Sequence, residues 1–558
     1  MTILDIDNSS FDYDARGLLT SFYPGELVLL PPQEEEMLRP KRRPRRDAQP
    51  GGGDPSAASE SEGGPADGKA AFHALFGPGE RRVLQIRIGE CRVEMDLFLG
   101  GSPEHAVRDD AGQICTAAAV AGVLADREDR AYDPAGGRGA VKTALKCGLY
   151  DLLSRVTGKT LPWGTLTGIR PVKLPMEMLQ EGAAAEEIPG RLIAAYSMSE
   201  KKARLAVEIA QVERRLLLAA GAQEAWSLYA GIPFCPTRCA YCSFPSYPAA
   251  QFAGRMDAYL DALEKELAYF AQAMSGRRLS TIYLGGGTPT SLSPDQLDRL
   301  LGFMEERFDT SSLLEWTVEA GRPDSITPEK LAALRRHPVT RISVNPQTMK
   351  EETLRLIGRR HTVDDVRRAF HMAREAGFDN INMDLIVGLP GETAADVART
   401  MEEIRALGPD SVTVHTLAIK RAARMSTEST DFADYERDMS EASMDEAAAA
   451  CRAMGLLPYY LYRQKNMAGN LENVGFAAPG KEGVYNILIM EEVQTIAAAG
   501  AGAVTKVLFP GGRIARTGNV KEPESYIARI DEMVERKRQL LEGDPGAAAT
   551  EPQEDFEE

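Results

Sequence analysis

The feature that most constrains the fold is a repeated alternation of short β-rich segments and longer helical segments between Ser227 and about residue 424. The six β-rich segments read SLYAGIPF, TIYLGGG, EWTVEAG, RISVNPQ, INMDLIVGLP and SVTVHTLA. One helix start is explicit, because Ser293 and Gln296 form the pattern of a capping box around Pro294. Six strand–helix units predict a parallel sheet, either doubly wound or curled into part of a barrel.

Small and polar residues cluster directly after these β-rich segments. They are Gly285 to Thr288, Glu319, Gln347, Asp384 and His415. In a β/α barrel the carboxyl ends of the strands share one face, and functional sites are built on that face. A barrel explains this convergence better than an open sheet does.

Composition shifts divide the rest of the chain. The first residues contain an apolar segment, and the stretch after Gln33 is so rich in charge, Gly, Ser and Pro that we expect it to be disordered. An alternating pattern about Gly89 predicts a strand pair, and helices are predicted at about 112–126 and 139–157. The predicted divisions are an N-terminal segment (1–32), a disordered insertion (33–70), an α+β domain (71–222), the barrel (223–424), a C-terminal substrate-covering domain (425–540) and a disordered acidic tail (541–558).

Charge and cysteine content exclude several classes of protein. The formal net charge is −17, which argues against broad nucleic-acid binding, since that needs a basic face. No apolar run approaches the length of a membrane span, and the N-terminus lacks the profile of a secretory signal. Seven cysteines are too few for a disulfide scaffold. We therefore expect a cytoplasmic protein with no stable membrane insertion.

Three of the cysteines, Cys235, Cys239 and Cys242, form a CxxxCxxC motif just after the first barrel strand. A disulfide is disfavoured in a reducing compartment. Structural zinc needs a fourth ligand, and no histidine lies nearby in sequence. A redox pair would use CxxC alone and leave Cys235 unused. The motif therefore favours an iron–sulfur cluster bound by three thiolates.

Three thiolates on a cubic 4Fe–4S cluster leave one iron without a protein ligand. That iron can chelate the amine and carboxylate of S-adenosylmethionine (SAM), and an electron from the reduced cluster can then cleave a C–S bond to give a 5′-deoxyadenosyl radical. Pro233, Phe234, Tyr241 and Phe244 would surround the cluster with apolar packing.

The run YAGIPFCPTRCAYCSFPSY, followed by YLGGGTPT, VEAGRPD, RISVNPQ, IGRRH and NMDLIVGLPGET, resembles the radical SAM superfamily. More narrowly, the chain resembles the oxygen-independent coproporphyrinogen III oxidase family in its HemZ-like branch, to which PWGTLTGIRP, PYYLYRQKNMAGNLENVG and YNILIMEEVQT are also similar. The resemblance covers about residues 160 to 530. It implies an α/β fold with a partial (β/α)6 radical SAM barrel, an N-terminal α+β domain and a smaller C-terminal α/β domain.

The resemblance also implies roles for individual residues. Cys235, Cys239 and Cys242 match the cluster ligands. The positions that match cofactor contacts are Tyr229, Tyr241, Gly286, Gly287, Thr288, Glu319, Gln347, Arg359, Asp384, Ala418 and Val504. A glycine lets backbone approach a ligand closely. A Gly triplet alone is more typical of a tight turn, but Thr288, Pro289 and Thr290 directly after the strand, downstream of the cysteines, favour the cofactor contact.

In the family reaction, two propionate side chains of coproporphyrinogen III lose CO2 and become vinyl groups, giving protoporphyrinogen IX. A tetrapyrrole substrate with four carboxylates needs cationic donors, and the candidates are Lys420, Arg421, Arg463 and Lys465. The neighbouring residues Tyr459, Tyr460 and Tyr462 either face the macrocycle or pack a C-terminal strand. The resemblance also implies a one-electron donor such as flavodoxin or ferredoxin.

The sequence departs from the characterised oxidases at Phe244, where those enzymes carry a further cysteine. Related chains with a phenylalanine at this position include haem chaperones, which bind haem without oxidising a porphyrinogen. The sequence therefore predicts the oxidase, with a haem-binding chaperone as the alternative.

Overall fold

The computed structural model describes residues 2–23, 28–29, 82–99, 123–168, 170–418, 441–464 and 471–543. These residues form two compact units, one made of 1–167 with 196–198 and the other of 168–195 with 199–558. The expected insertion at 33–70 lies outside the described residues, as does the expected tail beyond residue 543. Within the described residues, no helix is long and apolar enough to cross a membrane.

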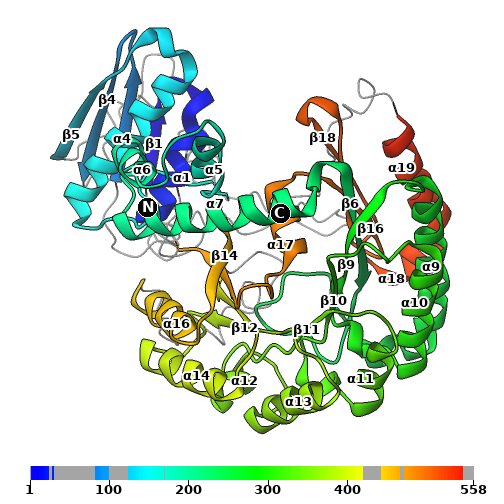
Figure 1. The fold of residues 1–558 in the computed structure, drawn as a ribbon. Helices are drawn as coiled ribbons and strands as arrows, with labels where there is room; N and C mark the ends of the chain where they lie inside the picture. Colours follow the sequence, from blue (N-terminus) through cyan, green and yellow to red (C-terminus); the bar gives the residue numbers. More distant parts are fainter. Residues whose placement is uncertain are drawn as a thin grey trace, which may run out of the picture. The chain divides into compact units, whose positions relative to one another are not determined.

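The first unit is a five-stranded sheet packed against helices (Figure 1). Its strands, in the order β2-β1-β3-β4-β5, are β1 (Thr2–Ile6), β2 (Val28–Leu29), β3 (Arg82–Ile88), β4 (Arg92–Leu99) and β5 (Val123–Ala131). The predicted strand pair about Gly89 is confirmed as the antiparallel pair β3–β4. Strand β1 pairs in parallel with β3, so the first residues belong to the same sheet instead of forming a separate segment.

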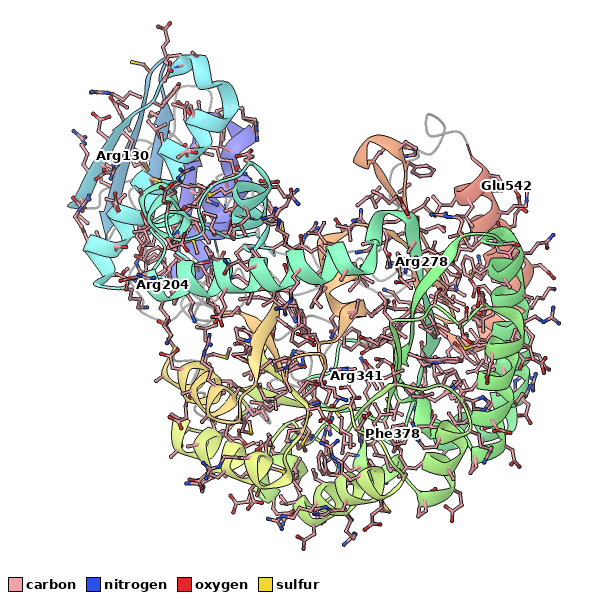
Figure 2. The ribbon with its side chains drawn as sticks, viewed as in Figure 1. Arg130, Arg204, Arg278, Arg341, Phe378 and Glu542 are labelled. Atoms are coloured by element: carbon pink, nitrogen blue, oxygen red, sulfur yellow. The ribbon has the colours of Figure 1, made fainter. Side chains whose placement is uncertain are left out.

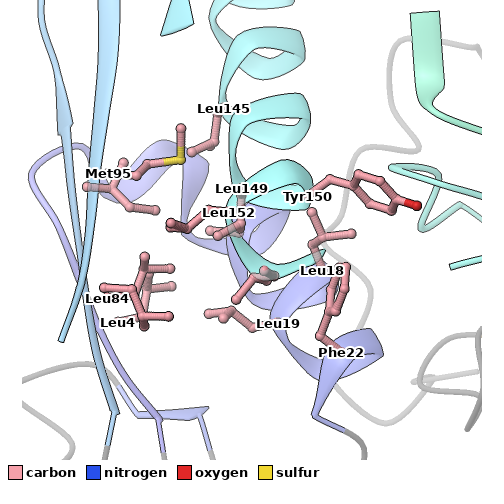
Figure 3. Packing of buried hydrophobic residues seen from close by; sticks show 14 of the residues in the cluster. Leu4, Leu18, Leu19, Phe22, Leu84, Met95, Leu145, Leu149, Tyr150 and Leu152 are labelled. Carbon is pink, nitrogen blue, oxygen red and sulfur yellow. The ribbon is translucent and has the colours of Figure 1, made fainter. Parts of the chain in front are cut away.

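The core of this unit lies between the sheet and two helices, α1 (Asp12–Phe22) and α4 (Gly137–Thr157). Figure 3 shows Leu84 and Met95 of the sheet facing Leu145 and Leu149 of α4, with Leu19 of α1 beside them. All five side chains are fully buried. One covered sheet face explains why apolar and polar residues alternate along β4.

The prediction of a helix at 112–126 is wrong in its described part, because residues 123–131 form strand β5. This segment pairs with β4 along its whole length. Cross-strand ion pairs support that register: Arg92 lies 2.8 Å from Asp129, and Arg127 lies 2.5 Å from Asp96. Pairing with a neighbouring strand therefore outweighs the helical propensity of a charged segment.

The second unit contains the barrel strands that the sequence predicts. They are β6 (Ala225–Ile232), β9 (Arg278–Gly286), β10 (Glu315–Glu319), β11 (Arg341–Ser343), β12 (Ile381–Val387) and β13 (Ser411–Thr416). Each strand is parallel to its neighbour. The helices α9 (Met256–Ala273), α10 (Pro294–Arg307), α11 (Pro328–Arg335), α13 (Val363–Glu375) and α14 (Ala394–Leu407) cover the outer face of the curved sheet (Figure 1). The capping box predicted at Ser293 is present.

The C-terminal strands extend both edges of this sheet. At one edge, β13 pairs with antiparallel β15 (Asn473–Ala477), which pairs in turn with β14 (Leu457–Tyr462). At the other edge, β6 pairs in parallel with β16 (Thr495–Ala499), and the sheet continues through β17 (Val504–Leu508) and β18 (Ile514–Gly518). Among the described strands, β14 and β18 are the two ends, so the sheet is open. The predicted α/β fold with a partial (β/α)6 barrel is confirmed. Helix α7 (Glu200–Ala220), expected in the 71–222 domain, lies in this unit.

Candidate active site

The three cysteines lie on one loop that leaves the carboxyl end of β6. Neighbouring segments hold the loop through its backbone. Ala240 N donates to Ile357 O at 2.9 Å, and Thr288 N donates to Phe234 O at 2.7 Å. Cys239 is buried, whereas Cys235 and Cys242 are half-buried. The fold therefore presents three thiols at the end of the barrel where the sequence places a site.

The surroundings of Cys235 and Cys242 disfavour free thiolates. Burial raises the pKa of Cys235 to about 11 and also raises the pKa of Cys242, and the neighbouring thiols act in the same direction. At Cys235 the Thr288 hydroxyl, 3.4 Å from Sγ, and the charge of Arg322 oppose this rise in pKa. Arg322 Nη1 also lies 3.7 Å from Cys239 Sγ. A bound cationic group would supply the missing positive charge and hold all three thiols ionised.

The donor set fits an iron–sulfur cluster, because three sulfur ligands on one loop are the ligand type that such clusters require. In the described part of the chain, no three His, Cys, Asp or Glu side chains already surround a single metal position. Cys235, Cys239 and Cys242 are the residues that would hold the cluster.

The glycine run after β9 packs tightly against the cysteine loop. Gly286 has a φ of 103°, a conformation that favours glycine. A Cβ on Gly287 would lie 2.7 Å from Phe234 O, which is too close for any side chain. Thr288 follows this turn and reaches Cys235. The glycine at position 287 thus serves the contact between two loops of the chain itself.

Glu319 is the last residue of strand β10, and its carboxylate contacts one of three stacked tyrosine rings. Tyr283 donates a hydrogen bond of 2.5 Å to its carboxylate. The Tyr283 ring stacks on Tyr485 at 4.5 Å between centroids and on Tyr229 at 6.2 Å. Burial raises the pKa of Glu319 to about 7; the Tyr283 hydrogen bond opposes this and Asp384 adds to it. A carboxyl group poised near neutral pH is typical of a functional site.

Gln347 has two features that mark a strained, functional position. Its φ is 68°, in the left-handed region, although it is not a glycine. Its Oε1 atom is buried and has no hydrogen-bond partner. Backbone bonds hold it there, since Gln347 N donates to Asp384 O and Ile386 N donates to Gln347 O, each at 2.9 Å. The fold thus maintains a conformation that the residue by itself disfavours, which is typical of ligand-binding sites.

Asp384 lies in the middle of strand β12, among polar partners. Asn382 Nδ2 donates to its Oδ1 at 2.6 Å, and His415 Nε2 lies 3.8 Å from its Oδ2. Burial raises the pKa of Asp384, but His415 and Asn382 outweigh burial and hold this pKa below its ordinary value. Asp384 is therefore ionised at neutral pH, and its hydrogen bonds within the protein come from neighbouring polar side chains.

Arg359 and Tyr241 form a pair beside the cysteine loop. Arg359 is buried, and its Nη1 donates to Asn345 O at 2.5 Å while its Nη2 donates to the Tyr241 hydroxyl at 3.3 Å. Burial lowers the pKa of Arg359, but Tyr241 and Cys239 raise it above its ordinary value. Arg359 thus links the loop after β11 to the cysteine loop.

The predicted substrate residues differ in their placement. Lys420, Arg421 and Lys465 lie outside the described residues. Arg463 is buried, donates to Leu471 O at 3.3 Å and Gly168 O at 3.5 Å, and has a pKa lowered to about 10 by burial. These contacts tie its side chain to two backbone segments.

Of the remaining predicted positions, Ala418 is half-buried just after β13. Val504 begins β17 and is separated from β6 by β16. Tyr459 and Tyr460 are buried in a cluster with Ile487, whereas Tyr462 lies 3.3 Å from His415 Nδ1.

Sequence reasoning missed several residues of this region. Arg322 contacts the cysteine loop, Asp324 and His361 lie behind it, and Tyr283 binds Glu319. A further buried cation, Arg341, begins β11 and donates to Ser411 Oγ at 3.0 Å (Figure 2). Arg341 could have been found, because a charged residue at the start of an apolar strand is a signal for a buried, paired charge.

Residues 229–404 match the family model described as the Radical SAM superfamily. The match begins at Tyr229 in β6 and includes the three-cysteine loop and the strand ends described above. The chain is thus a radical SAM protein, a class that implies a 4Fe–4S cluster and SAM.

The oxygen-independent coproporphyrinogen-III oxidase-like protein HemZ of Bacillus subtilis (strain 168) is 43% identical over 409 residues. The match covers 72% of this chain and 81% of that relative. The chain belongs to the HemZ-like, oxygen-independent coproporphyrinogen III oxidase-like family of radical SAM proteins.

Other relatives match a shorter part of the chain. The haem chaperone HemW of B. subtilis (strain 168) is 39% identical over 195 residues, 35% of this chain and 51% of that relative. The oxygen-independent coproporphyrinogen III oxidase of Escherichia coli (strain K12) is 35% identical over 192 residues, 34% of this chain and 42% of that relative. The solved structure of the E. coli oxidase HemN superposes with a TM-score of 0.46 at 26% identity, covering 57% of this chain and 73% of that one.

Proposed function

We propose that this protein converts two propionate side chains of coproporphyrinogen III to vinyl groups by oxidative decarboxylation, giving protoporphyrinogen IX. One observation carries the proposal. The three-cysteine loop lies at the same end of the barrel as Glu319 and Gln347, and Gln347 N donates to Asp384 O within β12, in a chain 43% identical to an oxidase-like relative over most of that relative's length.

In this proposal Cys235, Cys239 and Cys242 ligate the cluster, and the cofactor lies against the strand ends of β10, β11 and β12. When bound, the cluster and SAM would supply a 5′-deoxyadenosyl radical as the acceptor of one hydrogen atom from each propionate, and the side chain would then lose CO2 and pass one electron to an external one-electron acceptor. Asp384, ionised at neutral pH, accepts hydrogen bonds from hydroxyl groups of SAM. Gln347 offers its unpartnered Oε1 as a further acceptor. The Tyr229 ring stacks on Tyr283, the residue that donates a hydrogen bond to Glu319.

The substrate carries four carboxylates, so its pocket needs cations. We propose Lys420, Arg421 and Lys465 for this role. Arg463 would contribute by fixing the end of β14, where its two backbone hydrogen bonds hold the chain. The cofactor contacts proposed for Ala418 and Val504 are apolar. The partner that reduces the cluster would be an external one-electron carrier such as flavodoxin or ferredoxin.

The test uses full-length protein purified without air, reconstituted with iron and sulfide, reduced, and supplied with SAM and coproporphyrinogen III. We expect protoporphyrinogen IX and the loss of two CO2 per substrate, measured by chromatography and mass spectrometry. Cys239→Ala is the matched control: it should lose the cluster and all SAM cleavage, because a buried ligand is removed. SAM cleavage by reconstituted Cys239→Ala protein would contradict the ligand assignment.

A haem chaperone is the second candidate, and Phe244 favours it. The position that carries a cysteine in the characterised oxidases is here a phenylalanine, and its side chain is 64% exposed beside the cysteine loop. The chaperone HemW is also among the relatives. Stoichiometric haem binding with SAM cleavage but no vinyl product would support this candidate and exclude the oxidase.

A further inference from the structure

Arg322 lies just after β10, and its side chain forms hydrogen bonds with the cysteine loop. Its Nη1 donates to Thr237 O at 2.8 Å, and its Nη2 donates to Thr237 Oγ1 at 2.9 Å. The same Nη1 lies 3.7 Å from Cys239 Sγ. The guanidinium is almost completely buried, with 3% of the residue exposed. Two loops separated by 85 residues in sequence are therefore joined at the middle cysteine.

Arg322 and Asp324 form an ion pair with a defined orientation relative to Cys239. Asp324 binds the opposite edge of the guanidinium, with Oδ1 3.0 Å from Nε and Oδ2 2.8 Å from Nη2. Burial alone would raise the pKa of Asp324, but His361 and Arg322 hold it well below its ordinary value. The ion pair is thus a buried dipole whose positive end faces Cys239 Sγ and whose negative end faces away.

We infer that Arg322 is a positioning residue that fixes Thr237 and Cys239 of the ligand loop and raises the reduction potential of the cluster held there. This inference rests on the cluster assignment in the proposed function. Reduction adds negative charge to a cluster, so a buried cation and an N–H donor at a ligand sulfur stabilise the reduced form more than the oxidised form. The carboxylate of Asp324 partly offsets this effect from the far side.

The experiment compares midpoint potentials in full-length, reconstituted protein, followed by electron paramagnetic resonance during a redox titration. The variants are Arg322→Gln, which removes the charge and the guanidinium hydrogen bonds to Thr237, and Arg322→Lys, which keeps the charge. Asp324→Asn removes the opposing carboxylate. The control is Arg336→Gln, whose arginine is exposed and pairs with Asp298 on an outer helix. Iron and sulfide content is measured first in every sample.

We expect Arg322→Gln to lower the ratio of reduced to oxidised cluster at a fixed potential about tenfold, which corresponds to about 59 mV for a one-electron couple. Arg322→Lys should recover part of that loss, Asp324→Asn should shift the potential upward, and Arg336→Gln should change nothing. The shift is a readout that a merely structural role for Arg322 would not produce.

An unchanged potential in a fully loaded Arg322→Gln protein would overturn the inference and leave the proposed function standing. If Arg322→Gln does not hold a cluster, Asp324→Asn decides, and an unchanged or lowered potential in that variant overturns the inference. A wild-type protein that binds no cluster would refute the proposed function and the inference together. Cleavage of SAM in the presence of dithionite is measured in the same samples: cleavage by wild type with an unchanged potential in Arg322→Gln contradicts the inference alone, whereas no cleavage by wild type contradicts the proposed function.

Discussion

The protonation of Glu319 gives a prediction that needs no cofactor. Its half-buried carboxyl group accepts a hydrogen bond from Tyr283, and burial raises its pKa from an ordinary 4.5 to about 7. Between these two pH values the unfolded chain ionises Glu319 while the folded barrel keeps it protonated. Folding stability must therefore fall as the pH rises through this range.

The magnitude follows from the two pKa values. Each pH unit between 4.5 and about 7 is equivalent to ~1.4 kcal/mol, so the full difference is ~3 kcal/mol. Below pH 4.5 the group is neutral in both states and the difference vanishes, whereas above pH 7 it is present in full. Glu319→Gln cannot ionise and keeps an amide that Tyr283 can still bind. We expect this variant to become more stable than wild type by ~2–3 kcal/mol between pH 5 and pH 8.5.

The assay is denaturant unfolding of cluster-free protein at several pH values, followed by tryptophan fluorescence. Trp226 and Trp316 are buried in the barrel unit and report on its unfolding, whereas Trp163 belongs to the other unit. The quantity of interest is how the difference between variant and wild type changes with pH, since effects of the substitution that do not depend on pH then cancel. The control is Glu306→Gln, at an exposed position on α10.

A difference between Glu319→Gln and wild type that stays constant from pH 5 to pH 8.5 would refute the reasoning. It would mean that the carboxylate is solvated or paired in the folded protein. If the stability advantage of Glu319→Gln over wild type fell as the pH rises, the pKa of Glu319 in the folded protein would lie below 4.5, and the carboxylate would be stabilised by folding.

Three further substitutions test other parts of the site and fold. Asp384→Asn should retain the cluster but weaken SAM binding about tenfold or more, since a hydrogen bond to a charged group contributes ~1.5–3 kcal/mol; unchanged affinity by calorimetry would remove Asp384 from the site. Gln347→Gly should relieve the left-handed backbone and stabilise the barrel by ~1 kcal/mol while weakening SAM binding; a less stable protein would contradict the strain argument. Glu213 is buried, and among the described residues its carboxylate has no hydrogen-bond partner; burial, and secondarily Glu491, raise its pKa well above the ordinary value. Glu213→Gln should therefore stabilise the protein at pH 8 and have little effect near pH 4. Equal effects at both pH values would argue against a protonated Glu213.

The barrel strands could be predicted because they are buried on both faces, which produces near-continuous apolar runs such as INMDLIV in β12. The helix start at Pro294 could be predicted because a capping box is a local interaction. Strand β5 could not, because its residues VLADREDRA acquire strand structure only from pairing with β4. Likewise, β16 comes from the far C-terminal part of the chain but pairs with the first barrel strand, a long-range contact that periodicity does not contain.

The same distinction applies to the site. The cysteine loop is a local motif, so the sequence alone brings its three cysteines together. Arg322 belongs to the VEAGRPD segment that the sequence analysis singled out, but its role depends on Thr237, 85 residues earlier. Tyr283 becomes a partner of Glu319 only because β9 and β10 pair in parallel with Tyr283 opposite Thr317, two residues before Glu319. Side-chain partners across strands follow register, and register is decided by the whole sheet.

The glycine run shows why a motif can leave two interpretations standing. A Cβ on Gly285 would lie 3.1 Å from Glu319 Cδ and 2.9 Å from the Tyr283 ring, so glycine there makes room for the buried carboxyl group. A Cβ on Gly287 would meet the backbone that leads into the cysteine loop. The chain therefore needs these glycines to assemble its own strand ends. The tight turn is compatible with the predicted cofactor contact, because the packing that requires glycine also brings Thr288, the cysteine loop and Glu319 to one end of the barrel.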